Sequence, residues 1–192
     1  YTQLQHPNIL KVHRWQLDEE PMFILIESYA SAFVMDSNQK RSMRKQYLKQ
    51  LMSVFVFTHQ QNIFHQALHK KYIFLREDNS LCIGGWGLEF FPQIDKAVTY
   101  LPPEENANAK AKDVYAVALL SFEILAVHLP WEEKCSPSDI ADRKRKQELR
   151  PITAFGYPER LSNVFRKALS NYPVNRYENV EVMFEDIKKP PK

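Results

Sequence analysis

The side chains best suited to chemistry gather near the middle of the chain, around two histidines. His65 and His69 flank Ala67, and the basic residues Lys70 and Lys71 follow directly. A histidine works as a general base, or activates a nucleophile, when a nucleophile or an orienting carboxylate stands beside it. The adjacent sequence offers neither. One core histidine and one solvated loop histidine are therefore the simpler interpretation.

A glycine-rich turn is the second candidate. The chain has four glycines, and Gly84, Gly85 and Gly87 occur together around Trp86. Backbone N–H groups of such a turn can cradle a phosphate, but a P-loop also requires a lysine and a serine or threonine that this stretch lacks. We therefore expect a strand that runs into a turn.

A basic run is the third candidate, and the best candidate surface for a protein partner. Asp139, Asp142 and Glu148 dilute its charge, and the net charge of the whole chain is only +3. A solvated helix face is therefore favoured over a nucleic-acid site. The run consists of Arg143, Lys144, Arg145 and Lys146.

The composition indicates a globular intracellular protein, with the cytoplasm as the expected location. Hydrophobic residues make up 44% of the 192 residues and aromatic residues 12%, which is enough for one substantial core. Cys82 and Cys135 lie far apart and outside any zinc-binding spacing, so reduced thiols are expected and a disulfide has no support. The chain starts at Tyr1, not at Met, so we expect a fragment of a longer protein whose targeting signals are not visible.

The pattern of apolar residues predicts an α+β fold in which helices dominate. Apolar runs predict strands at 9–12, 22–26, 73–75 and 81–83, and helical spacing predicts a helix over 46–60. The most apolar stretch, 114–131, contains charged and polar residues, which favours a buried helix over a membrane span. We expect Asp113 to cap that helix and Pro130 to end it. Further helices are expected from Ser136 and over 161–169 and 180–187.

Several short motifs, in order, resemble those of the protein kinase family. His6-Pro7-Asn8-Ile9-Leu10 is similar to the segment before the fourth kinase strand, and 24–29 resembles the strand and hinge between the two lobes. Residues 65–75 align without a gap on the pattern HRDLKxxNILL, and Gly85-Trp86-Gly87 falls at the DFG position. Tyr100 to Glu104 resembles the APE region, Asp113-Val114-Tyr115 resembles the start of the central helix, and Leu129-Pro130-Trp131 follows it. The Arg150-Pro151 pair favours the tyrosine-kinase-like branch.

This resemblance implies a mainly helical C-lobe with the last strands of an incomplete N-lobe. We expect the end of the N-lobe over 1–26, the C-lobe over 27–189 and a tail over 190–192. The hinge and nucleotide pocket are expected to survive as a vestige, formed by Ile26, Glu27, Tyr29 and Phe74.

The same resemblance implies that catalytic positions are replaced. Ala67 stands where the family has its catalytic aspartate, and His69 stands where it has a lysine. Tyr72 replaces a magnesium-binding asparagine and Gly85 replaces the DFG aspartate, so both protein ligands of the metals are missing. We therefore expect no catalytic residue, no metal and no cofactor.

Structural positions of the family are kept, in contrast. His65 and Trp86 fall on positions of a hydrophobic spine, and Glu104 and Arg176 on a buried ion pair that it would be costly to break. Asp113 is also kept.

These expectations favour a non-enzymatic pseudokinase that acts as a scaffold or allosteric regulator. Its expected partner is another protein, such as an active kinase or the rest of a larger chain, and neither nucleic acid nor a membrane. The alternative is a divergent or residually ATP-binding protein kinase, which a nucleotide-dependent thermal shift would favour.

Overall fold

The computed structural model describes residues 4–16, 23–29, 31–88, 99–104, 106–131 and 136–190. Its strands form two small antiparallel sheets, both built from the first half of the chain. In one, β1 (Val12–Gln16) pairs with β2 (Phe23–Ile26). In the other, β4 (Ile73–Leu75) lies between β3 (Ser31–Ala32) and β5 (Leu81–Ile83). The strands predicted at 22–26, 73–75 and 81–83 are confirmed within a residue. The strand predicted at 9–12 is misplaced: β1 begins at Val12, and Ile9 and Leu10 instead lie beside Ile83 of β5, to which the Leu10 N–H donates at 2.8 Å. The short strand β3 was not predicted.

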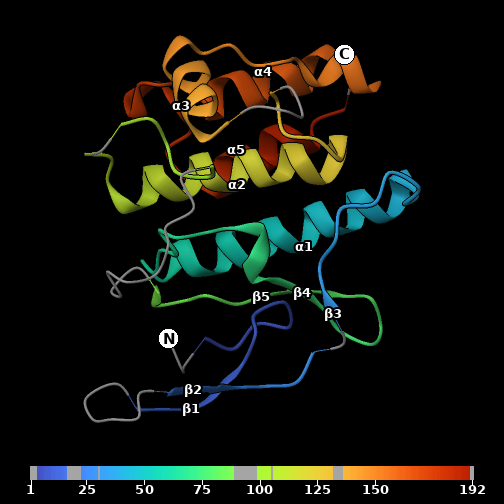
Figure 1. Ribbon diagram of the computed structural model, residues 1–192, viewed down its shortest axis with the longest axis vertical. Helices are drawn as coiled ribbons and strands as arrows, with labels where there is room; N and C mark the ends of the chain where they lie inside the picture. Colours follow the sequence, from blue (N-terminus) through green and yellow to red (C-terminus); the bar gives the residue numbers. More distant parts are fainter. Residues whose placement is uncertain are drawn as a thin grey trace.

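Helix α1 (Arg41–Gln60) packs against the second sheet. The helix begins at Arg41, earlier than predicted. The prediction missed its first residues because 41–46 lack the apolar spacing of the rest of the helix. One side of it is buried, including Tyr47, Leu51 and Phe55, as expected for an amphipathic helix against a core. Figure 1 shows α1 between the sheet and the long helix α2.

Helix α2 (Ala109–Ala126) is the buried central helix, and its start corrects a prediction. Asn108, not Asp113, is the cap, since the Asn108 side chain accepts from the Ala111 N–H. Asp113 lies inside the helix with a fully buried side chain. The helix ends at Ala126, before the predicted stop at Pro130, because Val127 takes a left-handed conformation with φ 67°.

Three shorter helices complete the described fold. Those over 137–146 and 159–168 lie beyond α2 in Figure 1, whereas the last one also packs against α1. Helix α3 (Pro137–Lys146) begins with a capping box between Ser136 and Asp139, as the sequence predicted. Helices α4 (Glu159–Ala168) and α5 (Val180–Lys188) confirm the two predicted amphipathic segments. Short 3-10 turns occur at Lys70–Tyr72, Ile152–Phe155 and Pro173–Asn175.

The core lies around α2, most of whose side chains are buried. Within the described ranges, no helix is long and apolar enough to cross a membrane. Cys82 is a buried free thiol, and burial raises its pKa to about 12, while Cys135 lies outside the described residues. The result is a mixed fold of few strands and many helices.

Candidate functional site

One buried carboxylate, that of Asp113, holds the loop 65–72 in place through hydrogen bonds. Its Oδ2 accepts from the His65 N–H and its Oδ1 from the Gln66 N–H, both at 2.7 Å. His59 Nε2 lies 3.2 Å from Oδ2. A carboxylate without solvent contact must be surrounded by donors, and these donors fix the backbone where Gln66 adopts φ 58°.

The ring of His65 locks the loop to the glycine-rich turn. Its side chain is buried, and Nε2 lies 2.9 Å from the Gly84 carbonyl oxygen. The ring centroid is 4.6 Å from that of Trp86 and 6.1 Å from that of Phe55. His65 and Trp86 thus lie in the core, where the resemblance places spine residues.

A second buried carboxylate, Glu123, holds the other end of the loop. It bonds Lys70 Nζ at 2.9 Å through Oε1 and accepts a short hydrogen bond from the Tyr100 hydroxyl through Oε2. The His69 ring packs edge-on against Tyr100 at 4.9 Å between centroids. The role of Lys70 and Glu123 was missed by the sequence analysis. The sequence did contain a signal for this pair: Glu123 is a lone glutamate inside an apolar helix, and a buried carboxylate requires a partner.

The four positions where the resemblance implies replaced side chains, 67, 69, 72 and 85, lie on the loop 65–72 and the adjacent turn. Tyr72 packs its ring against Gly85, whose φ is 82°, so tightly that a Cβ at Gly85 would stand 2.7 Å from Tyr72 Cγ. An aspartate at 85 and the ring of Tyr72 therefore exclude each other. Ala67, half-buried, has no side-chain oxygen or nitrogen.

Magnesium of the usual kinase type does not fit these residues. Mg²⁺ requires hard oxygen ligands in a tight octahedron, and the ring of Tyr72 fills the space beside Gly85 where a carboxylate would stand. No group of three or more His, Cys, Asp or Glu side chains that could hold a metal occurs among the described residues. We therefore derive no chemical step through a metal ion.

The region expected to form the hinge contains an ion pair between Glu27, which follows β2, and Arg76, which follows β4. Glu27 Oε1 lies 2.6 Å from Arg76 Nη2 and accepts from the Lys11 N–H at 3.0 Å. Burial raises the pKa of Glu27, but these two hydrogen bonds outweigh it and lower the pKa below its ordinary value. Arg76 also donates to the Ile9 carbonyl at 3.3 Å. Ile26 pairs with Val12 in the first sheet.

Two aromatic rings form the apolar part of the hinge region. The rings of Tyr29 and Phe74 lie 4.2 Å apart between centroids. Phe74 also approaches Gly84, where a Cβ would come within 3.1 Å of its ring. An aromatic surface of this kind can pack against the flat face of a planar ligand. The four expected pocket residues, Ile26, Glu27, Tyr29 and Phe74, thus fall in one region.

The pair Glu104 and Arg176 ties the segment after the site to the last helices. Arg176 Nη2 lies 2.7 Å from Glu104 Oε2, and the arginine side chain is fully buried. Its guanidinium also lies over the Tyr115 ring and donates to the Ala111 and Ser170 carbonyls. All the polar groups of the arginine are thereby used in holding the lobe together.

The basic run corrects a prediction, because one member is not on the surface. Lys144 is 3% exposed, and its Nζ donates to the Leu101 carbonyl at 2.7 Å between the rings of Tyr115 and Trp131. Burial lowers the pKa of Lys144 to about 7. A candidate partner patch on α3 is therefore limited to Arg143, Arg145 and Lys146, because the helix turns Lys144 inward.

Comparison with known proteins decides the family. The model of the protein kinase domain matches residues 1–183. The chain belongs to the protein kinase family. It is 26% identical over 148 residues to Aurora/IPL1-related protein kinase 2 of Caenorhabditis briggsae, which covers 69% of the chain and 49% of the relative. It is 22% identical to serine/threonine-protein kinase PrkC of Bacillus subtilis over 97% of the chain and 32% of PrkC.

The fold of a solved kinase agrees with this assignment. The crystal structure of Rad53 1-466 in complex with AMP-PNP superposes with a TM-score of 0.78 at 19% identity, over 97% of this chain and 52% of that one. The chain thus spans about half or less of the length of these relatives. The fold class expected from the sequence is confirmed.

One expectation is overturned by these comparisons. We expected the chain not to be an enzyme, but the family match and relatives named as kinases point to a kinase. The prediction of a non-enzyme is therefore wrong. Assignment to the tyrosine-kinase-like branch, which rested on Arg150-Pro151, remains a prediction.

Proposed function

We propose that this chain is the C-lobe of a divergent protein kinase that binds ATP beside the hinge and phosphorylates a hydroxyl group of another protein. The observation that carries the proposal is the match of the kinase family to residues 1–183. The aromatic surface of Tyr29 and Phe74 supports a nucleobase at the hinge. The structurally similar Rad53 was solved with AMP-PNP, an ATP analogue, which supports the same ligand class here. An intracellular location and a role in signalling belong to this proposal.

The chemistry must differ from that of other kinases because the residues on the loop 65–72 differ from the family pattern. Phosphoryl transfer is largely a matter of positioning and of stabilising charge on the phosphates. Loss of a general base at position 67 predicts a rate lower by about 10²–10⁴-fold. The loop instead presents basic groups. Lys71 stands with its Nζ 5.0 Å from the centre of the Tyr72 ring, next to Gly85.

We assign to Lys71 the role of a cation beside the phosphates. Lys71 is chosen for its position, with its Nζ over the Tyr72 ring that packs on Gly85, whereas Lys70 is paired with Glu123. Tyr72 closes the space beside Gly85. Together they suggest a site in which lysine charge, and not a carboxylate-held metal, faces the nucleotide.

The test is transfer of radiolabelled phosphate from ATP by the full-length protein, compared between two lysine variants. Lys71→Ala should lower the rate about tenfold, while Lys49→Ala, which removes an exposed lysine of α1, should leave it unchanged. A thermal shift with ATP should accompany activity. Absence of phosphate transfer and of any ATP-induced shift in the full-length protein would overturn the proposal.

A further inference from the structure

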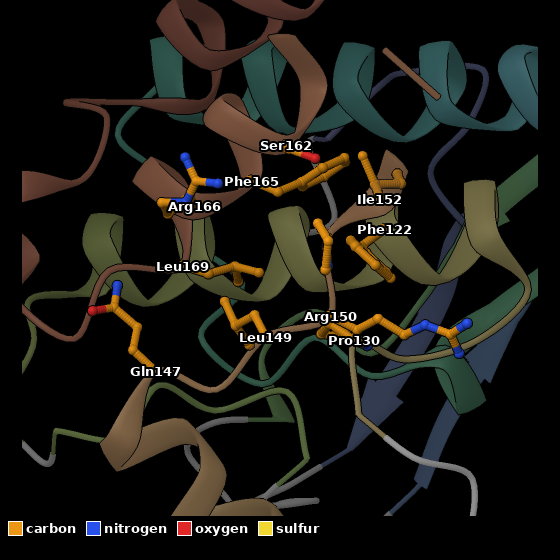
Figure 2. A pocket seen from close by; sticks show the side chains of 11 residues that line it. Phe122, Pro130, Gln147, Leu149, Arg150, Ile152, Ser162, Phe165, Arg166 and Leu169 are labelled. Atoms are coloured by element: carbon orange, nitrogen blue, oxygen red, sulfur yellow. The ribbon is translucent and has the colours of Figure 1, made fainter. Parts of the chain in front are cut away.

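A pocket with apolar walls opens between α2, the segment 147–152 and α4. Its volume is about 220 Å³. Figure 2 shows its apolar side chains converging from these three elements. They are Phe122, Leu149, Ile152, Phe165 and Leu169. For scale, an apolar cavity of about 150 Å³ holds a benzene molecule, so this pocket has room for one large apolar side chain.

The charged side chains of this pocket, among the described residues that line it, are two arginines. Arg150 comes from the segment 147–152 and Arg166 from α4, and both are exposed. In Figure 2 they lie on opposite sides of the apolar side chains. The Arg150 guanidinium stacks on the Phe155 ring at 4.8 Å. Arg166 lies 3.7 Å from Glu159, but both members of that pair are more than half exposed, so the attraction is weak. Both guanidinium groups can therefore accept a further carboxylate.

The basic run of α3 leads directly into this pocket. Arg145 and Lys146 are exposed and precede Gln147, which follows the last turn of α3 and lines the pocket. The Arg145 carbonyl accepts from the Asn171 side chain at 2.6 Å, which holds the end of α3 beside the chain that follows α4. Arg145 pairs with Asp142, again with both side chains more than half exposed. The pocket and the end of α3 thus form one surface, with an apolar centre and a basic surround.

The charge of the surrounding segments indicates the kind of partner. Residues 137–150 carry five basic and three acidic side chains, and residues 159–168 carry three basic and one acidic. Both segments that border the pocket therefore have an excess of positive charge. Guanidinium groups bind carboxylates through two parallel hydrogen bonds, and opposite charge across an interface selects the partner and speeds association. An acidic partner fits this surface, and a basic one does not.

We propose that this surface binds an acidic segment of a partner protein that carries one large apolar side chain. That side chain occupies the pocket, and carboxylates before and after it meet Arg150 and Arg166. The buried anchor supplies most of the affinity, while the charges at the rim select the segment. Binding does not depend on phosphate transfer, because the pocket shares no lining residue with the loop 65–72.

Binding is measured by fluorescence anisotropy, with the full-length protein and a labelled synthetic peptide. In the peptide, one phenylalanine is flanked on each side by three glutamates. Replacing the phenylalanine by alanine should weaken binding by about tenfold or more, because a large apolar side chain is no longer buried. Replacing the glutamates by lysines should weaken it by a similar factor, since attraction becomes repulsion. Added salt should weaken binding of the glutamate peptide and strengthen binding of the lysine peptide.

Charge-reversed variants of the protein locate the binding to the rim of the pocket. The double change Arg150→Glu and Arg166→Glu should make the protein prefer the lysine peptide to the glutamate peptide. Lys49→Glu, which reverses an exposed charge on α1, should leave the preference for glutamate unchanged. Glu159→Gln should strengthen binding of the glutamate peptide about twofold, because it frees Arg166 from a competing carboxylate.

A further variant tests the pocket itself. Leu149→Trp places a larger side chain in the pocket and should abolish binding of the phenylalanine peptide without lowering the ATP-induced thermal shift. Because that variant could misfold, its unfolding temperature is measured first. The double arginine variant, which changes only exposed side chains, decides the question if Leu149→Trp is unstable.

Three results would overturn the proposal. The first is equal affinity for the phenylalanine and alanine peptides. The second is a preference for glutamate that survives the double arginine variant. The third is a dimer of the full-length protein that the peptide dissociates, because a second copy of the chain would then be the occupant. None of these results bears on the kinase proposal, which is tested separately by phosphate transfer.

Discussion

The loop 65–72 and the pocket between α2, the segment 147–152 and α4 differ in how their buried polar groups are paired (Figure 2). Around the loop, Asp113 has three hydrogen-bonding neighbours and Glu123 has two. In the wall of the pocket, the Ser162 hydroxyl has no partner among the described residues. The paired carboxylates fix the backbone of the loop, although the Nδ1 atoms of His59 and His65 beside them also lack a partner there. The comparison separates a segment held by buried hydrogen bonds from one held mainly by apolar packing.

The largest effect should come from removing the central carboxylate of the loop. Asp113→Ala leaves the N–H groups of His65 and Gln66 without an acceptor and should lower the free energy of unfolding by about 3–5 kcal/mol. Asp142→Ala, which removes an exposed carboxylate of α3 paired with Arg145, should change it by less than about 0.5 kcal/mol. Urea denaturation of both variants measures the difference. Similar losses in the two would show that Asp113 is not the anchor of the loop.

A smaller effect is expected at the other end of the loop. Tyr100→Phe removes the hydroxyl that donates to Glu123, which should cost about 1.5–3 kcal/mol because the acceptor is charged and buried. Tyr172→Phe, where the side chain is 67% exposed, should cost almost nothing. Thermal unfolding monitored by circular dichroism compares them. Unchanged stability of Tyr100→Phe would mean that Lys70 alone satisfies Glu123.

The buried lysine of α3 should make stability depend on pH. The pKa of Lys144 is lowered to about 7 in the folded state, against an ordinary value of about 10.5 in the unfolded chain. Above pH 7 the unfolded chain therefore holds the proton that the folded chain has released, so the free energy of unfolding rises with pH. The slope is at most about 1.4 kcal/mol per pH unit.

Denaturation in urea between about pH 7 and pH 8 measures this slope. The upper limit stays below the ordinary cysteine pKa of about 8.5, above which ionisation of the Cys82 thiol in the unfolded chain opposes the trend. Lys144→Met should remove the slope, because a thioether has no proton to release. A slope that persists in Lys144→Met would assign it to another group.

The smallest effect sharpens the comparison itself, with two buried serines. Ser162→Ala removes an unpaired hydroxyl and should raise the free energy of unfolding by up to about 1 kcal/mol. Ser121→Ala removes a hydroxyl that donates to the Val117 carbonyl at 2.6 Å and should lower it by about 1 kcal/mol. Urea denaturation of the two variants should therefore give changes in the free energy of unfolding of opposite sign. Destabilisation in both variants would show that Ser162 has a partner in solution.

Much of the fold could be predicted from the sequence, since apolar spacing marks α1, α4 and α5 and the strands around the loop. The start of α2 could not be. Residues 109–112 alternate alanine and lysine, which hides a helical turn, so the first carboxylate after them resembled a cap. The inward turn of Lys144 was equally hidden, because a basic run is usually solvated and the burial depends on Trp131 and Tyr115, which are distant in the sequence.

The sequence predicted the position of the site better than its function. The order of motifs located the loop 65–72 and the turn at Gly85, and these are brought together as the resemblance implied. Replacement of the family residues then suggested inactivity, which the relatives contradict. The pocket beside Ser162 could not be predicted from the sequence, because its walls come from three separate segments.

One measurement tests the central claim, that the loop 65–72 serves a divergent kinase, most directly. Purified full-length protein is incubated with radiolabelled ATP under single-turnover conditions, and phosphate incorporated into protein is counted for the wild type, Lys71→Ala and Lys49→Ala. The account predicts slow incorporation that falls about tenfold in Lys71→Ala and is unchanged in Lys49→Ala. No incorporation by the wild type, or equal incorporation by all three proteins, would contradict it.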